Sequence, residues 1–519
     1  MNTSRELKSA VGAVVVLVLS LLLATPFAYT WTGSHSAGPP SCISMLHLNI
    51  PGTTISSAQT VPAADDLPEY CSVVGVISPA VHFEVRMPPS WNGKMYFRGN
   101  GGFGGHIVLD TSLGLSRGYA TVATDLGHQS PDISDASWAL DNRPAEIDFG
   151  YRAVHVSSVV GKIIIRSYYG SLPKHSYFEG CSNGGRLGLQ EAERYPEDFD
   201  GIIAGAPDMD FTGLMINFNW DMQSQRATDT SSDLTPEKAV LIGGAVLAAC
   251  DGIDGLVDGL IDDPRKCHFK PSSLLCKAGD APNCLTQPQV EALEKIYSGP
   301  HTSDGKRIYP GFARGGETPD ASFNGFDAWL INTPDSPSGA FAFQDQFFRY
   351  LAFKDDNANF YWGNFDFDTD PRRTTFMGTI LNATNRSLAD FNRAGGKLLM
   401  YQGWSDFAMT PFRTIEFYES VQRELGVKRT DNFARLFMAP GMFHCSDGPG
   451  PNDFDYLTAT ERWVEKGIAP NSIVAQHLDE DGNVDRTRPL CAYPQVARYK
   501  GAGSIDQAAN FRCVQPKSE

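Results

Sequence analysis

The chain has 519 residues, of which 42% are hydrophobic and 20% charged, so it can bury a large core and exceeds the size of one ordinary domain. Its formal net charge is −17 at pH 7 and it contains no run of lysine and arginine, so its field repels phosphate backbones and anionic lipid surfaces. We therefore expect no nucleic acid partner, and no membrane contact beyond a possible N-terminal anchor. The length favours one large domain with an insertion, or two domains.

The N-terminus has the pattern of an export signal. Arg5 and Lys8 precede an apolar run over residues 10–28, "AVGAVVVLVLSLLLATPFA". Such a run is typical of a signal peptide or an N-terminal anchor, and its length fits either, so we predict one of the two over residues 1–30. The protein is then expected to be secreted, periplasmic or held at the cell surface.

Between residues 91 and 210, strand-like and helix-like segments alternate. Strands are predicted at 93–99, 118–125, 175–180 and 201–205, and helices at 149–170 and 185–199. Apolar runs at 395–406 and 434–445 continue the series. This alternation predicts an α/β fold with a parallel sheet, built from residues 41–210 and 389–519. Residues 211–388 lack the rhythm and are predicted to form an inserted domain.

The segment "EGCSNGGR" (179–186) contains the strongest catalytic signal. Gly180, Ser182 and Gly184 match the GxSxG nucleophile elbow, with a predicted strand before it and a predicted helix after it. A serine hydroxyl needs a base and an orienting acid, which in this fold follow in the order Ser, Asp or Glu, His. Ser182 is therefore the candidate nucleophile.

Asp406 and His444 are the candidate acid and base. Each follows an apolar run, so both are expected at the carboxyl edge of the sheet, where Ser182 also lies. Asp447 and His128 are the competing choices, but they break the expected order. The oxyanion would be stabilised by the N–H of Asn183 and by a second donor in the loop "RGNGGFGG" (98–105), for which Gly101 and Gly102 are the candidates.

The ten cysteines form an even set without a CxxC pair, which favours disulfides in an oxidising compartment. If near neighbours pair, four short loops close, namely Cys42–Cys71, Cys250–Cys267, Cys276–Cys284 and Cys491–Cys513. Cys181 and Cys445 are left over, and they flank Ser182 and His444. If nucleophile and base meet, these two cysteines come close enough for a disulfide.

An acidic loop, "CDGIDGLVDGLIDD", spans residues 250–263. It carries Asp251, Asp254, Asp258 and Asp262 between glycines, and such oxygen ligands suit Ca²⁺. We expect its apolar side chains to point inward: Ile253, Leu256, Val257, Leu260 and Ile261. The spacing is not that of an EF-hand, so a solvated acidic turn fastened by the Cys250 and Cys267 pair is the alternative.

Five segments of the chain resemble the tannase and feruloyl esterase family, which includes a terephthalate monoester hydrolase: "RGYATVATDLGH", "GCSNGGR", "RYPEDFDGIIAGAP", "GGKLLMYQGWSD" and "PGMFHCSDGPGP". The resemblance implies an α/β-hydrolase fold with a large inserted lid. It implies a triad of Ser182, Asp406 and His444 flanked by Cys181 and Cys445, and it matches the five cysteine pairs. It also implies a structural calcium ion in the lid, held by Asp251, Asp254 and Asp258 and by the carbonyls of Leu256 and Leu260.

These observations predict a secreted serine carboxylic-ester hydrolase. It would cleave small esters of aromatic acids of the hydroxycinnamic, gallic or terephthalic type through an acyl-enzyme. Two alternatives stay open. One is a catalytically silent binding protein with the same fold, and the other is an acyltransferase or peptidase that uses the same triad.

Overall fold

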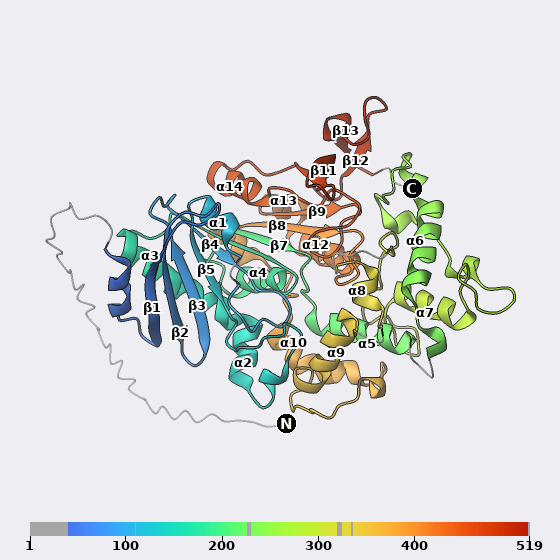
Figure 1. Ribbon diagram of the computed structural model, residues 1–519, viewed down its shortest axis with the longest axis horizontal. Coiled ribbons are helices and arrows are strands. Elements are labelled where there is room, and N and C mark those ends of the chain that lie inside the picture. Colours follow the sequence, from blue (N-terminus) through green and yellow to red (C-terminus); the bar gives the residue numbers. More distant parts are fainter. Residues whose placement is uncertain (1–39, 109, 226–229, 319–323, 334–335, 517–519) are drawn as a thin grey trace, which may run out of the picture. The chain divides into compact units, whose positions relative to one another are not determined.

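The computed structural model describes residues 40–108, 110–225, 230–318, 324–333 and 336–516 (Figure 1). The predicted leader, residues 1–30, lies outside these ranges. Within them, no helix is long and apolar enough to cross a membrane.

A nine-stranded mixed sheet forms the centre of the fold. In spatial order its strands are β1 (Thr53–Val61), β2 (Tyr70–Ile77), β3 (Val81–Met87), β5 (Ala120–Thr124), β4 (Lys94–Arg98), β6 (His175–Cys181), β7 (Gly201–Gly205), β8 (Lys397–Gly403) and β9 (Ala434–Ala439). The strands from β5 to β9 run parallel to one another, while β1, β2 and β3 are antiparallel to their neighbours. The predicted α/β class and its parallel sheet are therefore confirmed, and the three antiparallel strands are an addition that the sequence analysis missed.

Alternating side chains of the parallel strands enter two separate cores. Phe97 and Phe178 lie in one core with Leu187, whereas Tyr96 and Tyr177 lie in the other. Successive side chains of a strand point to opposite faces of the sheet, and here both faces are buried. These strands therefore appear in the sequence as continuous apolar runs. Both faces of the sheet are therefore covered.

The α-helices of the described residues are α1 (Ser112–Ser116), α2 (Arg143–Ile147), α3 (Ala153–Tyr169), α4 (Asn183–Arg194), α5 (Phe211–Gln225), α6 (Pro236–Cys250), α7 (Gln287–Ser298), α8 (Phe326–Leu330), α9 (Gly339–Tyr350), α10 (Thr375–Leu381), α11 (Ala389–Ala394), α12 (Pro411–Leu425), α13 (Val427–Asp431) and α14 (Tyr456–Lys466). Two differ from the predicted ranges. A π-helical turn at Asp148–Arg152 precedes α3, and α4 ends at Arg194 because Pro196 disfavours helix at the residue before it.

The segment between β7 and β8 supplies helices and no strand of the sheet in its described part. Figure 1 shows α6 and α7, in green, on the side of the sheet away from β1, β2 and β3. Helix α5 begins at Phe211 and α11 at Ala389, next to the predicted limits of the insertion at 211 and 388. Those limits remain a prediction.

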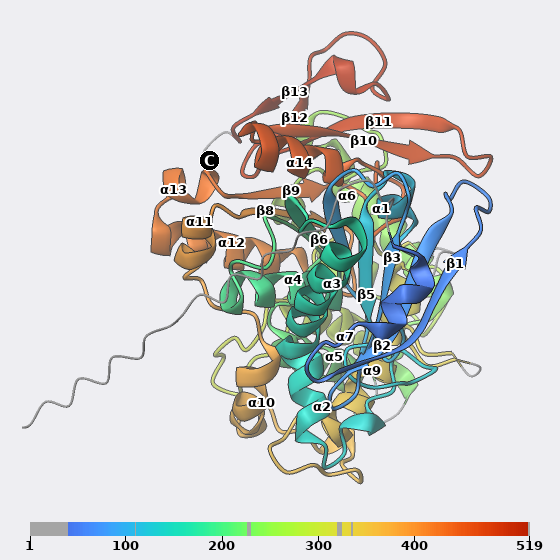
Figure 2. The same cartoon turned by 90° about the vertical axis from the view of Figure 1, so that its left-hand side faces the viewer.

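The C-terminal residues form two small hairpins, which the sequence analysis also missed. They are β10 (Ser472–Leu478) with β11 (Val484–Cys491), and β12 (Val496–Tyr499) with β13 (Phe511–Val514). Figure 2 shows β10 and β11 beside β9, and the N–H of Tyr493 donates to the carbonyl of Leu436 on β9 at 2.7 Å. The hairpins therefore extend the core beyond the last parallel strand.

Candidate functional site

Ser182 occupies a strained turn between β6 and α4. Its backbone has φ 63° and ψ −127°, a conformation that non-glycine residues rarely adopt. The turn is so compact that a Cβ atom at Gly180 would lie 2.6 Å from the backbone of Gly184, and a Cβ atom at Gly185 would lie 2.4 Å from the carbonyl oxygen of Gly205. The glycines of this segment therefore allow the sharp turn that presents Ser182 at the end of the strand.

Asp406 and His444 are joined by a buried hydrogen bond. Nδ1 of His444 lies 3.0 Å from Oδ2 of Asp406, and the two residues are 6% and 1% exposed. They come from the loops that follow β8 and β9, which are adjacent parallel strands. The carboxylate can thus fix the tautomer of the imidazole so that Nε2 is free to accept a proton.

Asp406 is itself held by several donors. Its Oδ1 accepts from the backbone N–H groups of Ala408 and Met409, each at 2.8 Å, and its Oδ2 accepts from the side-chain amide of Gln402 at 2.8 Å. The amide oxygen of Gln402 accepts in turn from the Thr414 hydroxyl at 2.9 Å. Gln402 is not among the predicted site residues, although a glutamine inside the apolar run "KLLMYQG" is unusual and is the one local sign of its position.

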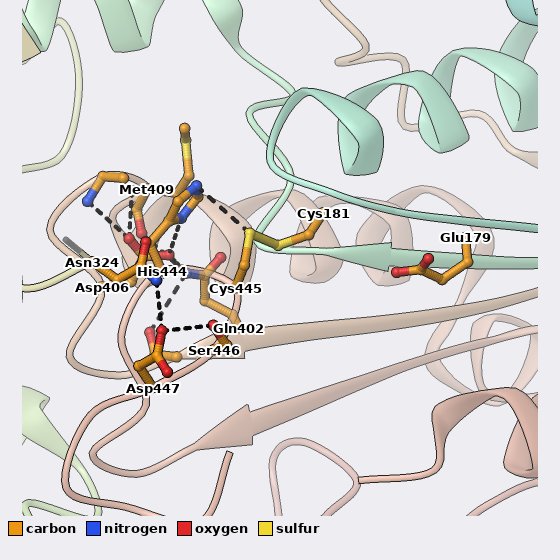
Figure 3. The surroundings of a disulfide bond; sticks show 12 residues. Glu179, Cys181, Asn324, Gln402, Asp406, Met409, His444, Cys445, Ser446 and Asp447 are labelled. Atoms are coloured by element: carbon orange, nitrogen blue, oxygen red, sulfur yellow. Dashed lines mark hydrogen bonds and ion pairs between the residues drawn. A yellow bond between two sulfur atoms is a disulfide. The ribbon is translucent and has the colours of Figure 1, made fainter. Parts of the chain in front are cut away.

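A disulfide joins Cys181 to Cys445, whose Cα atoms are 5.9 Å apart (Figure 3). It links the residue before Ser182 to the residue after His444, across 264 positions of sequence. Nε2 of His444 lies 3.6 Å from Sγ of Cys445, and no hydrogen bond joins it to Ser182 within the described ranges. Hydrogen bonds between a catalytic base and its nucleophile are often loose without substrate.

The other four disulfides are Cys42–Cys71, Cys250–Cys267, Cys276–Cys284 and Cys491–Cys513. Together with Cys181–Cys445 they are the five pairs that the sequence analysis expects, and the described residues contain no free cysteine.

Ser182 and His444 line one cavity of about 540 Å³ between the core and the inserted helices. Its apolar wall includes Phe103, Phe211, Phe218, Trp329 and Phe343. Trp329, on α8 of the insertion, meets the imidazole of His444 edge to face at 5.2 Å. The insertion therefore covers the candidate catalytic base and supplies an aromatic lining.

The candidate oxyanion donors lie beside this cavity. Gly101 and Gly102 both line it, and a side chain added to Gly101 would meet no atom within 4 Å, so the loop is open there. Asn183 is the first residue of α4, where backbone N–H groups have no partner within the helix. Its side-chain amide donates to the carbonyl of Asn100 at 3.1 Å, which ties the elbow to the glycine loop.

The competing residues lie outside the Asp406 and His444 pair. Oδ2 of Asp447 accepts hydrogen bonds from Asn324 at 2.7 Å and from Ser446 at 2.9 Å. His128 is buried and stacks on the indole of Trp138 at 3.7 Å, and burial lowers its pKa to about 4. Neither contact includes His444.

The acidic loop is folded around its own carboxylates. Asp251 accepts from the backbone N–H groups of Asp258 at 3.1 Å and Gly259 at 3.0 Å, and Asp258 pairs with the buried guanidinium of Arg488 at 2.8 Å. Arg488 also lies 3.9 Å from Asp262. Arg488 thus lies beside two carboxylates of this loop, and carboxylate and carbonyl oxygens are the ligands that a calcium ion prefers.

The predicted inward orientation is confirmed for two apolar side chains of this loop and is wrong for two others. Leu260 and Ile261 are buried, but Ile253 and Val257 are 47% and 81% exposed. The loop forms only a short turn of 3₁₀ helix at Asp251–Asp254, so it has no regular apolar face to bury.

The sequence pattern of the tannase and feruloyl esterase family matches residues 67–514. An uncharacterised esterase of Xanthomonas campestris pv. campestris is 37% identical, over 96% of this chain and 94% of its own length. The mono(2-hydroxyethyl) terephthalate hydrolase of Piscinibacter sakaiensis is 33% identical, over 89% of this chain and 87% of its own length.

The crystal structure of feruloyl esterase B from Aspergillus oryzae superposes with a TM-score of 0.83 and 26% identity, over 91% of this chain and all (100%) of that one. The α/β-hydrolase fold that the sequence predicts is therefore confirmed. The chain belongs to the tannase and feruloyl esterase family, and it is a carboxylic ester hydrolase.

Proposed function

We propose that the protein hydrolyses small esters of aromatic acids, with Ser182 as nucleophile, His444 as base and Asp406 as the orienting acid. The observation that carries this proposal is the buried hydrogen bond between Asp406 and His444, at the cavity that Ser182 lines. The disulfide between the neighbours of Ser182 and His444 supports it, because it limits the separation of the two reacting side chains.

In the first half of the reaction, Oγ of Ser182 forms a bond to the ester carbonyl carbon and its proton passes to Nε2 of His444. The bond from that carbon to the alcohol oxygen then breaks, and the alcohol leaves with the proton from His444. In the second half, water attacks the acyl-enzyme and gives its proton to His444, which returns it to Ser182 as the acid leaves. Asp406 stabilises the imidazolium in both halves.

The negative charge on the carbonyl oxygen needs donors that are fixed before the reaction. We assign the backbone N–H of Asn183 as one donor and that of Gly101 or Gly102 as the other. The proposal is supported by the position of both glycines on the cavity and by the hydrogen bond between Asn183 and Asn100.

The substrate class follows from the wall of the cavity. Aromatic rings from both the core loop and the insertion, among them Phe103, Phe218 and Trp329, favour a flat apolar acid. Among the relatives, one is named for a terephthalate monoester and another for ferulate. We therefore propose aromatic acids of the hydroxycinnamic, gallic or terephthalic type.

A calcium ion in the insertion is part of the same proposal. Asp251, Asp254 and Asp258 would bind this ion together with the carbonyl oxygens of Leu256 and Leu260. The ion would add to the positive charge of Arg488, which lies beside the carboxylates of Asp258 and Asp262. The calcium ion would have a structural role, because its proposed ligands Asp251 and Asp254 do not line the cavity of Ser182.

Export is also proposed. The five disulfides are consistent with an oxidising compartment, and the apolar N-terminal segment is typical of a leader. We infer a secreted, periplasmic or surface-held enzyme.

The function is tested by hydrolysis of methyl ferulate, methyl gallate and the 2-hydroxyethyl monoester of terephthalic acid, with Ser182→Ala as the control. We expect turnover of at least one ester and loss of turnover in the control. Absence of turnover with retained ligand binding would favour a silent binding protein. Faster cleavage of an aromatic amide or peptide, or transfer of the acyl group to an added alcohol in place of water, would favour a peptidase or an acyltransferase.

A further inference from the structure

One buried carboxylate of the cavity has no part in the proposed mechanism. Asp208 follows β7, is 3% exposed and lines the same cavity as Ser182. Its Oδ1 is buried and accepts no hydrogen bond from any residue in the described ranges. Buried acceptors in folded proteins nearly always have a hydrogen-bond donor. Oδ1 of Asp208 is therefore expected to accept a hydrogen bond from a molecule bound in the cavity.

The charge of Asp208 is already offset, although its Oδ1 accepts no hydrogen bond from the part of the chain that the structure describes. Nε of Arg186 lies 3.7 Å from Oδ1 of Asp208, which is close enough for attraction but too long for a hydrogen bond. Arg186 instead donates to Asn183 and to the carbonyls of Phe149, Gly150 and Leu381. Its guanidinium is therefore fixed in place by other acceptors.

Asp208 is ionised under neutral conditions. Burial raises the pKa of Asp208 to about 6, while the positive charges of Arg186 and of protonated His444 act in the opposite direction. At pH 7 and above it is therefore chiefly a carboxylate, which accepts hydrogen bonds and donates none.

A carboxylate whose charge is offset by Arg186, and whose Oδ1 lacks a donor, favours one type of ligand group over others. A cation is not required, because Arg186 already supplies the counter-charge. A second carboxylate, as in a terephthalate monoester, would be repelled by Asp208. Arg98 also lines the cavity, but it is already paired with Glu179. A neutral hydroxyl donor satisfies Asp208 without adding charge.

The residues that follow Asp208 indicate which part of the ester carries that hydroxyl. Phe211, Met215 and Phe218 lie on α5, directly after Asp208 in the chain, and all three line the cavity. An aromatic acid that packs on these side chains occupies the same cavity as the carboxylate of Asp208. This shared cavity favours a hydroxyl on the ring of the acid over one on the alcohol.

We propose that the carboxylate of Asp208 accepts a hydrogen bond from a ring hydroxyl of the substrate, and so makes the enzyme selective for hydroxyaryl esters over esters with a ring carboxylate or a capped hydroxyl. The proposal rests on the proposed esterase function and adds the group that chooses among its substrates. Asp208 also lies near His444, so the rival explanation is that it acts on the base and affects all esters alike.

The test compares methyl 4-hydroxycinnamate with methyl 4-methoxycinnamate, which differ only at the ring substituent. We expect the wild type to prefer the hydroxyl ester in kcat/KM by about 100-fold or more, since sites built around a substrate hydroxyl reject analogues that lack it. Asp208→Asn should reduce the preference to below about 10-fold and Asp208→Ala to about 1, and both should increase kcat/KM for the terephthalate monoester. Asp210→Asn, two positions away at the Arg413 ion pair, is the matched control and should keep the preference.

Two results would overturn the assignment. One is a wild type that cleaves both cinnamates equally well. The other is an Asp208 variant that lowers kcat/KM for both by the same factor, which would place its effect on His444. If the wild type cleaves no ester at all, the proposed function fails, and binding of 4-hydroxycinnamamide against 4-methoxycinnamamide by calorimetry still decides the subsite. Tighter binding of the hydroxyl amide, lost in Asp208→Asn and Asp208→Ala, supports it; equal binding contradicts it.

Discussion

Nδ1 of His444 and Oδ2 of Asp406 lie 3.0 Å apart in a site that is almost closed to solvent. The contact joins the loops after two adjacent strands, β8 and β9, and it leaves Nε2 as the basic nitrogen of an imidazole that lines the same cavity as Ser182. The arrangement requires the carboxylate, since an amide in its place would stabilise the other tautomer.

Asp406→Asn should lower kcat by roughly 10⁴-fold with little change in folding, because the imidazole would no longer present a free Nε2 to the serine. The matched control is Asp447→Asn, whose carboxylate contacts Asn324 and Ser446 and not His444. It should change kcat by less than about 3-fold. Steady-state kinetics of both variants on one ester show which aspartate orients His444. An inactive Asp447→Asn variant together with an active Asp406→Asn variant would assign that role to Asp447.

Replacing either cysteine of the Cys181–Cys445 pair should lower both kcat and thermal stability, and replacing both should cost little more than replacing one. The chain-entropy model gives about 5 kcal/mol for a loop of this length, and measured values are often smaller. Thermal unfolding and kinetics of Cys181→Ala, Cys445→Ala and the double variant provide the comparison, with the other four disulfides verified by peptide mapping. Additive losses, or a neutral double variant, would mean that the disulfide does not hold nucleophile and base together.

The elements that the sequence predicts best are those whose pattern is local. The strand, turn and helix around Ser182 follow from apolar alternation and from glycine spacing, and β8 and β9 follow from their apolar runs. Strand β1 was missed because it is a half-exposed edge strand whose place depends on pairing with β2. Helix α5 was missed because nearly all of its side chains are buried, so it shows no amphipathic period.

The residues of the site also divide into those with a local sequence pattern and those that depend on tertiary contacts. The order of Ser182, Asp406 and His444 is visible in the sequence, since each ends a recognisable segment. Gln402 reaches Asp406, and Asp208 reaches the cavity, only when separate strands and loops meet. In the segment "GAPDMD", Asp208 has no local pattern that sets it apart from a surface aspartate. Such residues require the tertiary structure.

Glu146 should make stability fall as the pH rises. It is 1% exposed, and burial raises its pKa to about 7; its ion pair with Arg143 opposes this increase, and Asp356 adds to it. Below its unfolded pKa of about 4.3 both states hold the proton, and between about 4.3 and 7 only the folded state does. Over that window the free energy of unfolding should fall by roughly 2–4 kcal/mol through this group.

Glu146→Gln removes this dependence, so the difference in unfolding free energy between variant and wild type should grow between pH 5 and 7.5. Urea unfolding at both pH values measures it. Glu237→Gln, at an exposed glutamate on α6, is the control and should show no such trend. A constant difference for Glu146→Gln would show that its carboxyl group is ionised in the folded protein throughout this range.

Removal of calcium should destabilise the insertion and leave the chemistry intact. After EDTA treatment and desalting we expect a lower Tm that calcium restores and magnesium does not, since the proposed ligands are flexible oxygen donors. Asp254→Asn should weaken this response, and Asp263→Asn, whose carboxylate pairs with Arg265, should preserve it. A Tm that is independent of calcium in the wild type would support the solvated acidic turn.

The assignment of Ser182 as nucleophile and His444 as base is tested most directly by labelling with an alkyl fluorophosphonate followed by peptide mass spectrometry. The serine oxygen displaces fluoride from phosphorus only when a base removes its proton, so the label reports the nucleophile and the base together. We predict one adduct per chain, on the peptide that contains Ser182, formed at least about 10³-fold more slowly in His444→Ala. An adduct on a different serine, or an unlabelled Ser182 in protein that still hydrolyses esters, would contradict the assignment.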